Sequence, residues 1–168
     1  MVAIRSERAE DIPAIRTINI AAFTGKTEAD LVDVLRDRGK LSLSLVAEED
    51  NVLVGHIAFS KVTIDEWPSL RGAGLAPMAV VPGMQRKGIG SALVRAGLET
   101  CRSLGYSFVI VVGHAHYYPR FGFRPAKNYG IKCLWEVPDD VFMVLELQQR
   151  SLTGVHGLVR YEPEFNEV

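Results

Sequence analysis

The chain has 168 residues, of which 48% are apolar and 23% are charged, and its formal net charge is -1. This length suits a single domain with a sizeable core over residues 1–168, and the balanced charge lacks the basic excess of a general nucleic-acid binder. No apolar run approaches the length of a membrane-spanning helix, so we expect a globular protein without a membrane partner.

The first part of the chain has the periodicity of strands and amphipathic helices. We expect, in order, a strand at residues 2–5, helices at 11–23 and 27–38, and strands at 42–47 and 52–62. Pro13 is tolerated in the first turn of its helix, and Gly39 follows the end of the next helix. A polar turn joins the last two strands, which are therefore expected to pair antiparallel.

The second part of the chain continues the alternation of strands and helices. We expect a strand at residues 76–81, a helix at 88–104, and strands at 108–112, 142–147 and 155–161, the last at an edge. The strand at 108–112 is apolar throughout, which is typical of a strand buried on both faces. Gly97 lies in the middle of the predicted helix, where glycine costs about 1 kcal/mol relative to alanine, so we expect close packing there.

The N-terminal residues and the two cysteines indicate the compartment. Residues 1–5 lack the hydrophobic region of a signal peptide, and Cys101 and Cys133 lie too far apart in the chain to suggest a disulfide framework. We therefore expect a cytoplasmic protein in which each cysteine is a buried thiol.

A loop with two glycines joins the strand at 76–81 to the helix at 88–104. Gly88 and Gly90 stand at the start of the helix, and Arg86 and Lys87 precede them. The start of a helix presents N–H groups without partners and a partial positive charge, and glycine lets an anion approach the backbone. The loop is therefore a candidate phosphate site.

Two common phosphate-binding motifs do not fit this loop. Gly83 and Gly88 have the spacing of a P-loop, but Ile89 and Gly90 stand where that motif needs Lys and Ser or Thr. A dinucleotide-binding fingerprint that starts at Gly88 would need its third glycine at Leu93. What remains is Gln-x-x-Gly-x-Gly between a strand and a helix, and the alternative to a phosphate site is a turn whose glycines serve packing.

The loop resembles a known motif. Residues 85–90 read Gln-Arg-Lys-Gly-Ile-Gly and resemble the acyl-CoA loop of the GNAT superfamily of N-acetyltransferases. A second segment, residues 117–123, is similar to the F-Y-x-x-x-G-F motif of that superfamily. Segments similar to residues 75–80, 117–123 and 141–147 recur in this order in its YhbS-type branch, and the order of predicted elements agrees over nearly the whole chain.

The resemblance implies a fold and a cofactor. The expected fold is mixed α/β, with a central mixed sheet of about six to seven strands splayed between the fourth and fifth, flanked by about four helices. Acetyl-CoA is the implied cosubstrate, and no metal is expected, because His114 and His116 have no Cys or acidic partner at ligand spacing. Backbone groups on the strand and in the loop are implied to hold acetyl-CoA: Met78, Ala79, Val80, Gln85, Arg86, Lys87, Gly88, Ile89, Gly90 and Ser91.

Catalytic and acceptor residues are expected outside the loop. Tyr118 matches the tyrosine that faces the departing sulfur in the superfamily, although it would also suit an apolar core. No carboxylate lies on the strands at 76–81 and 108–112, so the base is His114, Glu28 or a chain of water molecules. Glu28 and His56 are candidates for binding the acceptor. The alternative for Glu28 is that it stabilises the start of a helix, and the alternative for His56 is that it is hydrogen-bonded within the sheet.

The predicted function is transfer of acetyl from acetyl-CoA to a primary amine by direct attack. The acceptor is a small molecule or peptide, and dimerisation is common in the superfamily. A non-catalytic acyl-CoA-binding sensor or interaction module is the alternative, since the two strands lack a carboxylate base. A third hypothesis, modification of charged tRNA, has little support from the net charge of -1.

Overall fold

The computed structural model describes all 168 residues and divides them into two compact units. The first unit comprises residues 1–60, 76–97 and 163–168, and the second comprises residues 61–75 and 98–162. Strands β3 (Val52–Ile64) and β4 (Gly72–Val80) and helix α3 (Ile89–Ser103) contribute residues to both units. The single-domain organisation stays a prediction, and each unit is described by itself below.

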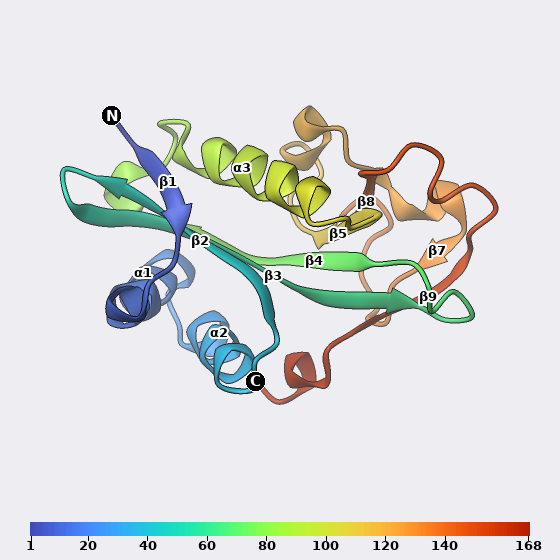
Figure 1. Cartoon of the computed structure of the whole chain (residues 1–168), viewed down its shortest axis with the longest axis horizontal. Coiled ribbons are helices and arrows are strands. Elements are labelled where there is room, and N and C mark those ends of the chain that lie inside the picture. Colours follow the sequence, from blue (N-terminus) through green and yellow to red (C-terminus); the bar gives the residue numbers. More distant parts are fainter. The chain divides into compact units, whose positions relative to one another are not determined.

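The first unit combines antiparallel strands with two packed helices. Strand β1 (Ala3–Ser6) pairs with β2 (Leu41–Glu49), β2 pairs with β3, and β4 follows β3 in the sheet. Helices α1 (Ile12–Phe23) and α2 (Thr27–Asp37) pack against each other, as Figure 1 shows at the blue end of the chain. Ile15 of α1 and Val32 of α2 are buried with Val46 of β2, which fixes the helices to the sheet.

The predicted close packing at Gly97 is confirmed in the first unit. A Cβ atom at Gly97 would lie 2.5 Å from Cε1 of Phe59, a side chain with no solvent exposure. Glycine is therefore needed at this point of α3 because the Phe59 ring on β3 occupies the space of a side chain.

The second unit is built around strand β5 (Phe108–Val112). Strand β8 (Phe142–Glu146) pairs antiparallel with β5 and with the short β6 (Arg124–Pro125). Strand β9 (Gly157–Tyr161) pairs antiparallel with the end of β3 and parallel with β7 (Ile131–Lys132). One face of these strands buries Phe108, Ile110 and Val144 in an apolar core that also includes Val62 and Val159. Short 3-10 turns complete the chain at Ala9–Asp11, Pro82–Met84, Tyr118–Phe121, Ala126–Tyr129 and Pro163–Asn166.

The predicted splay of the sheet is confirmed by the pairing of β4 with β5. These parallel strands pair from Gly72 with Phe108 to Gly74 with Ile110, and their pairing ends there. Both strands continue, β4 to Val80 and β5 to Val112. The later residues of β4 therefore have no backbone partner on β5.

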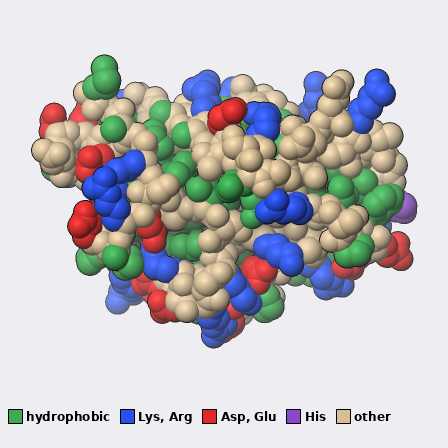
Figure 2. All heavy atoms as spheres, viewed as in Figure 1, with side chains coloured by type: hydrophobic (Ala, Val, Ile, Leu, Met, Phe, Trp, Pro, Cys, Tyr) green, Lys and Arg blue, Asp and Glu red, His purple; other side chains and the backbone are tan.

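The mixed α/β fold class is confirmed, while two details differ from the prediction. Strand β4 begins at Gly72 rather than residue 76, because Gly72 and Gly74 lie under aromatic rings instead of in a loop. The structure has three α-helices where about four are expected, because the chain between β5 and β8 forms only the 3-10 turns Tyr118–Phe121 and Ala126–Tyr129. The additional strands β6 and β7 have two residues each. No helix has both the length and the hydrophobicity that crossing a bilayer requires. Figure 2 shows basic and acidic side chains interspersed over the face in view.

Candidate active site

The glycine loop ends β4 and begins α3 within the first unit. The carbonyl of Gly88 accepts a hydrogen bond from the N–H of Ala92 at 3.0 Å, which makes Gly88 the residue that caps the helix. N–H groups in the first turn of a helix, here those of Ile89 and Gly90, have no acceptor inside the helix. They form a site for an anion at the positive end of α3.

The loop backbone adopts left-handed conformations that leave open space. Arg86 has a φ of 63° and Gly88 a φ of 86°. A non-glycine residue in this region costs free energy, and such residues occur in tight turns and at functional sites. A Cβ atom at Gly88 would meet no atom within 4 Å. Glycine at this position therefore serves the backbone conformation and leaves room for a ligand, not for a neighbouring side chain.

The exposed Gln85 anchors the loop through its hydrogen bonds. Its side-chain amide donates a hydrogen bond to the carbonyl of Val80 at 3.0 Å, and its backbone N–H donates to the carbonyl of Pro82 at 3.4 Å. Both donors of Gln85 therefore hold the loop to the end of β4. Arg86 and Lys87 are exposed, and the Lys87 ammonium lies 3.9 Å from the sulfur of Met84.

The end of β4 presents backbone groups on one side. The N–H of Val81 donates to the carbonyl of Val54 on β3 at 2.9 Å. Successive N–H groups along a strand point to opposite edges, so the N–H groups of Val80 and Met78 point away from β3. Ala79 and Val80 are buried, and Met78 is half-buried.

Tyr118 lies in an aromatic cluster of the second unit, next to the end of β5. A Cβ atom at Gly113 would lie 2.5 Å from Cε2 of Tyr118, so glycine directly after β5 is what lets the ring approach. The ring makes edge contacts with Tyr117 and Phe123 at centroid distances of 5.1 and 5.7 Å. Burial raises the pKa of Tyr118, with a smaller contribution from Tyr117, so the phenol keeps its proton at neutral pH.

His114 is exposed at the start of the same loop. Its backbone carbonyl accepts hydrogen bonds from the N–H groups of Tyr117 at 3.0 Å and Tyr118 at 3.4 Å. The loop that carries His114 is therefore tied directly to the backbone of Tyr118. Neither Gly113 nor this backbone link was predicted, although a glycine between a buried strand and an aromatic motif is a signal for close approach.

His56 is enclosed in the first unit. Its side chain has no solvent exposure, and its ring nitrogens lie 3.2 Å from the amide nitrogen of Asn19 and 2.9 Å from the hydroxyl of Ser44. The Ser44 hydroxyl donates to Glu7, which pairs with Arg36 at 2.7 Å. This geometry corrects the prediction of His56 as an acceptor-binding residue, because an acceptor cannot reach a side chain that burial and two hydrogen bonds enclose.

Burial also sets the protonation state of His56. Desolvation lowers its pKa to about 4, against a smaller raising effect of Glu7. The ring is therefore neutral at pH 7, which allows one ring nitrogen to accept from Asn19 while the other donates to Ser44. Neither Asn19 nor Ser44 was identified from the sequence, because their contacts with His56 are long-range.

The other candidate residues have separate places. Glu28 lies half-buried in the first turn of α2, where a carboxylate stabilises the positive end of the helix. Its position therefore fits the alternative to acceptor binding, which is stabilisation of the helix start. Cys101 has no solvent exposure, and burial raises its pKa to about 12, which is the expected inert thiol. Cys133 is only half-buried, so its prediction as a buried thiol was wrong. The structure contains no group of three or more His, Cys, Asp or Glu residues that could hold a metal ion.

Comparison with known proteins agrees with the fold. Residues 3–126 match the family described as acetyltransferase (GNAT) domain. The chain is 37% identical to the N-acetyltransferase YhbS of Escherichia coli strain K12 over 164 residues, which are 97% of this chain and 98% of that protein.

Two solved structures extend this similarity. The crystal structure of Escherichia coli YhbS in complex with CoA has a TM-score of 0.94 and 36% identity, covering 98% of this chain and 92% of the other. A GNAT acetyltransferase from Brucella melitensis, in complex with acetyl-CoA, has a TM-score of 0.82 and 35% identity, covering 98% of both chains. The chain therefore belongs to the GNAT family of acetyltransferases.

Proposed function

We propose that this acetyltransferase binds acetyl-CoA and moves the acetyl group to a primary amine by direct attack. The observation that carries the proposal is the open loop at Gly88, whose left-handed backbone leads into the first turn of α3, where the N–H groups of Ile89 and Gly90 have no acceptor inside the helix. Two relatives that share more than a third of their residues with this chain were crystallised with CoA or acetyl-CoA.

The cofactor is proposed to contact the loop and the end of β4. The pyrophosphate lies on backbone amides from Arg86 to Ser91, where the helix start and the cations of Arg86 and Lys87 offset its charge. Gln85 supports this loop through its side-chain hydrogen bond to Val80. The pantetheine arm pairs with the outward-facing backbone groups of Met78 and Val80, as an added strand would. A single N–H donor aimed at the thioester oxygen, here that of Val80, stabilises the oxyanion by a few kcal/mol.

The reaction has one bond-forming and one bond-breaking event. The lone pair of the neutral amine attacks the thioester carbonyl carbon, an oxyanion forms, and the carbon–sulfur bond then breaks with its electron pair going to sulfur. Tyr118, which burial keeps protonated, donates a hydrogen bond to the departing thiolate and passes its proton to the sulfur while taking one back from solvent, since its raised pKa does not favour a lasting tyrosinate. The proton that the amine loses goes to His114, to Glu28 or to water, and His114 is the exposed imidazole among these.

Calorimetric titration with acetyl-CoA, CoA and ATP tests the first step. We expect saturable, near-stoichiometric binding of acetyl-CoA and CoA, and weaker binding of ATP. If neither acetyl-CoA nor CoA binds, the proposed cofactor site is wrong and the proposed transfer is contradicted with it. Release of CoA with a panel of amines tests the second step, and tight binding without any transfer would favour an acyl-CoA sensor over an enzyme.

A further inference from the structure

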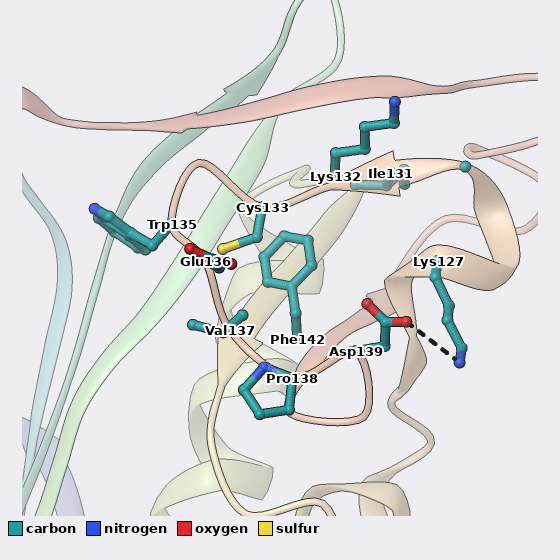
Figure 3. A pocket seen from close by; sticks show the side chains of 11 residues that line it. Lys127, Ile131, Lys132, Cys133, Trp135, Glu136, Val137, Pro138, Asp139 and Phe142 are labelled. Atoms are coloured by element: carbon teal, nitrogen blue, oxygen red, sulfur yellow. Dashed lines mark ion pairs between the residues drawn. The ribbon is translucent and has the colours of Figure 1, made fainter.

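A cavity of about 340 Å³ opens in the second unit, where residues 127–139 lead into β8. Its volume falls within the range of small-molecule sites. Figure 3 shows the side chains that surround it, which come from a continuous stretch of chain leading into β8. Apolar side chains form much of the lining, together with one carboxylate that makes no ion pair: Ile131, Cys133, Trp135, Val137, Phe142 and Glu136.

The cavity lies on the face of the sheet that carries the apolar core. Phe142 pairs directly with Val112 at the end of β5, so the two side chains share a face with Ile110 and Phe108. The Trp135 ring lies 4.7 Å from the ring of Tyr161. Tyr161 in turn lies 2.9 Å from the Cβ position of Gly74, the last residue of β4 that pairs with β5. The cavity therefore lies beside the point where the two strands stop pairing.

Tyr118 is on the other face of β5. Side chains alternate along a strand, so residue 113 faces opposite to Val112. Gly113 is the residue whose Cβ position contacts the Tyr118 ring. An attacking amine approaches the carbonyl carbon from above the plane of the thioester, in which the sulfur lies. The amine therefore needs an approach separate from that of the sulfur, and a cavity on the face opposite to Tyr118 suits it.

Two acids and two lysines line the cavity, and one acid among them has no ion pair. Asp139 pairs with Lys127 at 3.7 Å, as the dashed line in Figure 3 marks, whereas Glu136 forms no ion pair. The ammonium of Lys132 points away from Glu136 and Phe142 in Figure 3. A ligand in this cavity therefore meets several apolar walls and the unpaired carboxylate of Glu136, with which an ammonium can pair, while Lys132 lines the cavity with its own ammonium directed elsewhere.

We infer that this cavity binds the acceptor, and that the acceptor is a monoamine with an apolar aryl or alkyl body. The body lies against Phe142, Val137 and Ile131, and Glu136 attracts the ammonium before deprotonation. This inference rests on the proposed acetyl transfer and adds the class of its substrate. Polyamines and short polar amines fill the apolar walls poorly, so they are weaker substrates.

The test compares two charge-removing variants with three amines. Wild type should acetylate 2-phenylethylamine with a kcat/KM about tenfold or more above that of spermidine or ethanolamine. Glu136→Gln should raise KM for 2-phenylethylamine about fivefold and leave the Kd of acetyl-CoA unchanged. Asp140→Asn is the matched control, since Asp140 is exposed on the same segment and does not line the cavity, and it should change neither value. Equal KM values in the two variants, or a preference for the polar amines, would overturn the inference.

A binding measurement separates this inference from the proposed transfer. In Trp67→Phe the remaining indole is Trp135 at the cavity wall, and its fluorescence should change saturably on titration with 2-phenylethylamine. The same change without acetyl-CoA binding would support the cavity while contradicting the transfer. Acetyl-CoA binding without any fluorescence change would support the cofactor site and overturn the cavity.

Discussion

Gly88 and Gly97 stand at the start and in the middle of α3, and the space around them differs. At Gly88 the backbone is left-handed, and no atom lies within 4 Å of the position that a Cβ atom would take. At Gly97 the backbone is helical and the same position is filled by the ring of Phe59. One glycine leaves space for a ligand, and the other makes space for a neighbour inside the protein. The residue type alone carries no information on which of these roles applies.

The same contrast separates the polar groups of the first unit. Backbone N–H groups at the start of α3 have no acceptor inside the helix, whereas both ring nitrogens of His56 have partners within 3.2 Å. Groups that are satisfied inside the protein stabilise the fold, and groups that are not satisfied are available for binding. Substitutions in the two regions should therefore affect different measurements.

The largest effect is expected from Gly88→Val. The new side chain would occupy the space proposed for phosphate, so we expect the Kd of acetyl-CoA to rise about a hundredfold, or about 2.7 kcal/mol. Gly39→Val is the matched control, because Gly39 also has a positive φ, at 69°, and no atom within 4 Å of its Cβ position. Both variants carry similar backbone strain and should lose similar stability in urea unfolding. Unchanged affinity in Gly88→Val would contradict the assignment of the loop.

Gly97→Ala should lower the stability of the fold and leave the affinity for acetyl-CoA unchanged. Alanine would improve helix propensity by about 1 kcal/mol, but its Cβ would force the buried Phe59 ring to move, at a cost of about 1–3 kcal/mol. We expect a net loss of about 1–2 kcal/mol in the free energy of unfolding, with the Kd of acetyl-CoA unchanged. The double variant with Phe59→Leu should lose less stability than the sum of the single variants. Additive losses would mean that the ring is not the obstacle.

The sequence predicted the local features of the site and fold better than the long-range ones. The loop from Gln85 to Gly90 and the strand Phe108–Val112 are continuous segments whose pattern is visible without knowledge of the rest of the chain. The environment of His56 depends on Asn19 and Ser44, which lie 37 and 12 residues away in the chain. Alternation within a strand gives the side of the sheet that a residue faces, and not the partners that it meets there.

Glycines in strands are a second source of error. Gly72 and Gly74 have the composition of a loop, yet they lie in β4 because a side chain at either position would collide with Phe108 or Tyr161. Such packing against distant rings leaves no local signal. The loop at Gly88 was predictable for the opposite reason, since a strand end, two glycines and a helix start are adjacent in the sequence.

The protonation of His56 gives a prediction for pH. Its pKa is lowered to about 4 in the folded protein, so between pH 6.5 and 4 the unfolded chain binds a proton there and the folded protein does not. The free energy of unfolding should therefore be at its full value above pH 6.5 and should fall by about 1–2 kcal/mol on acidification to pH 5. The carboxylates of Glu7, Asp11 and Glu164, whose pKa values are lowered by ion pairs, add their own losses at lower pH.

His56→Gln and His116→Gln separate this contribution from those of other groups. Glutamine at 56 keeps a neutral donor and acceptor without a titrating ring, so its stability should vary less between pH 6.5 and 5 than that of wild type. His116 is exposed, and its replacement should leave the wild-type slope unchanged. A slope in His56→Gln equal to that of wild type would assign the acid sensitivity to other groups.

Tyr118 combines the two kinds of environment, because its ring is packed and its hydroxyl is proposed to act in the reaction. Tyr118→Phe keeps the ring contacts with Gly113 and Phe123 and removes only the proton donor. A thiolate leaves readily without full protonation, so we expect kcat to fall only about tenfold, or about 1.4 kcal/mol, with little change in KM for acetyl-CoA. Tyr117→Phe, in the same aromatic cluster, is the control and should keep the wild-type kcat. If both variants turn over like wild type, Tyr118 is a packing residue, and the proton for the thiolate comes from solvent.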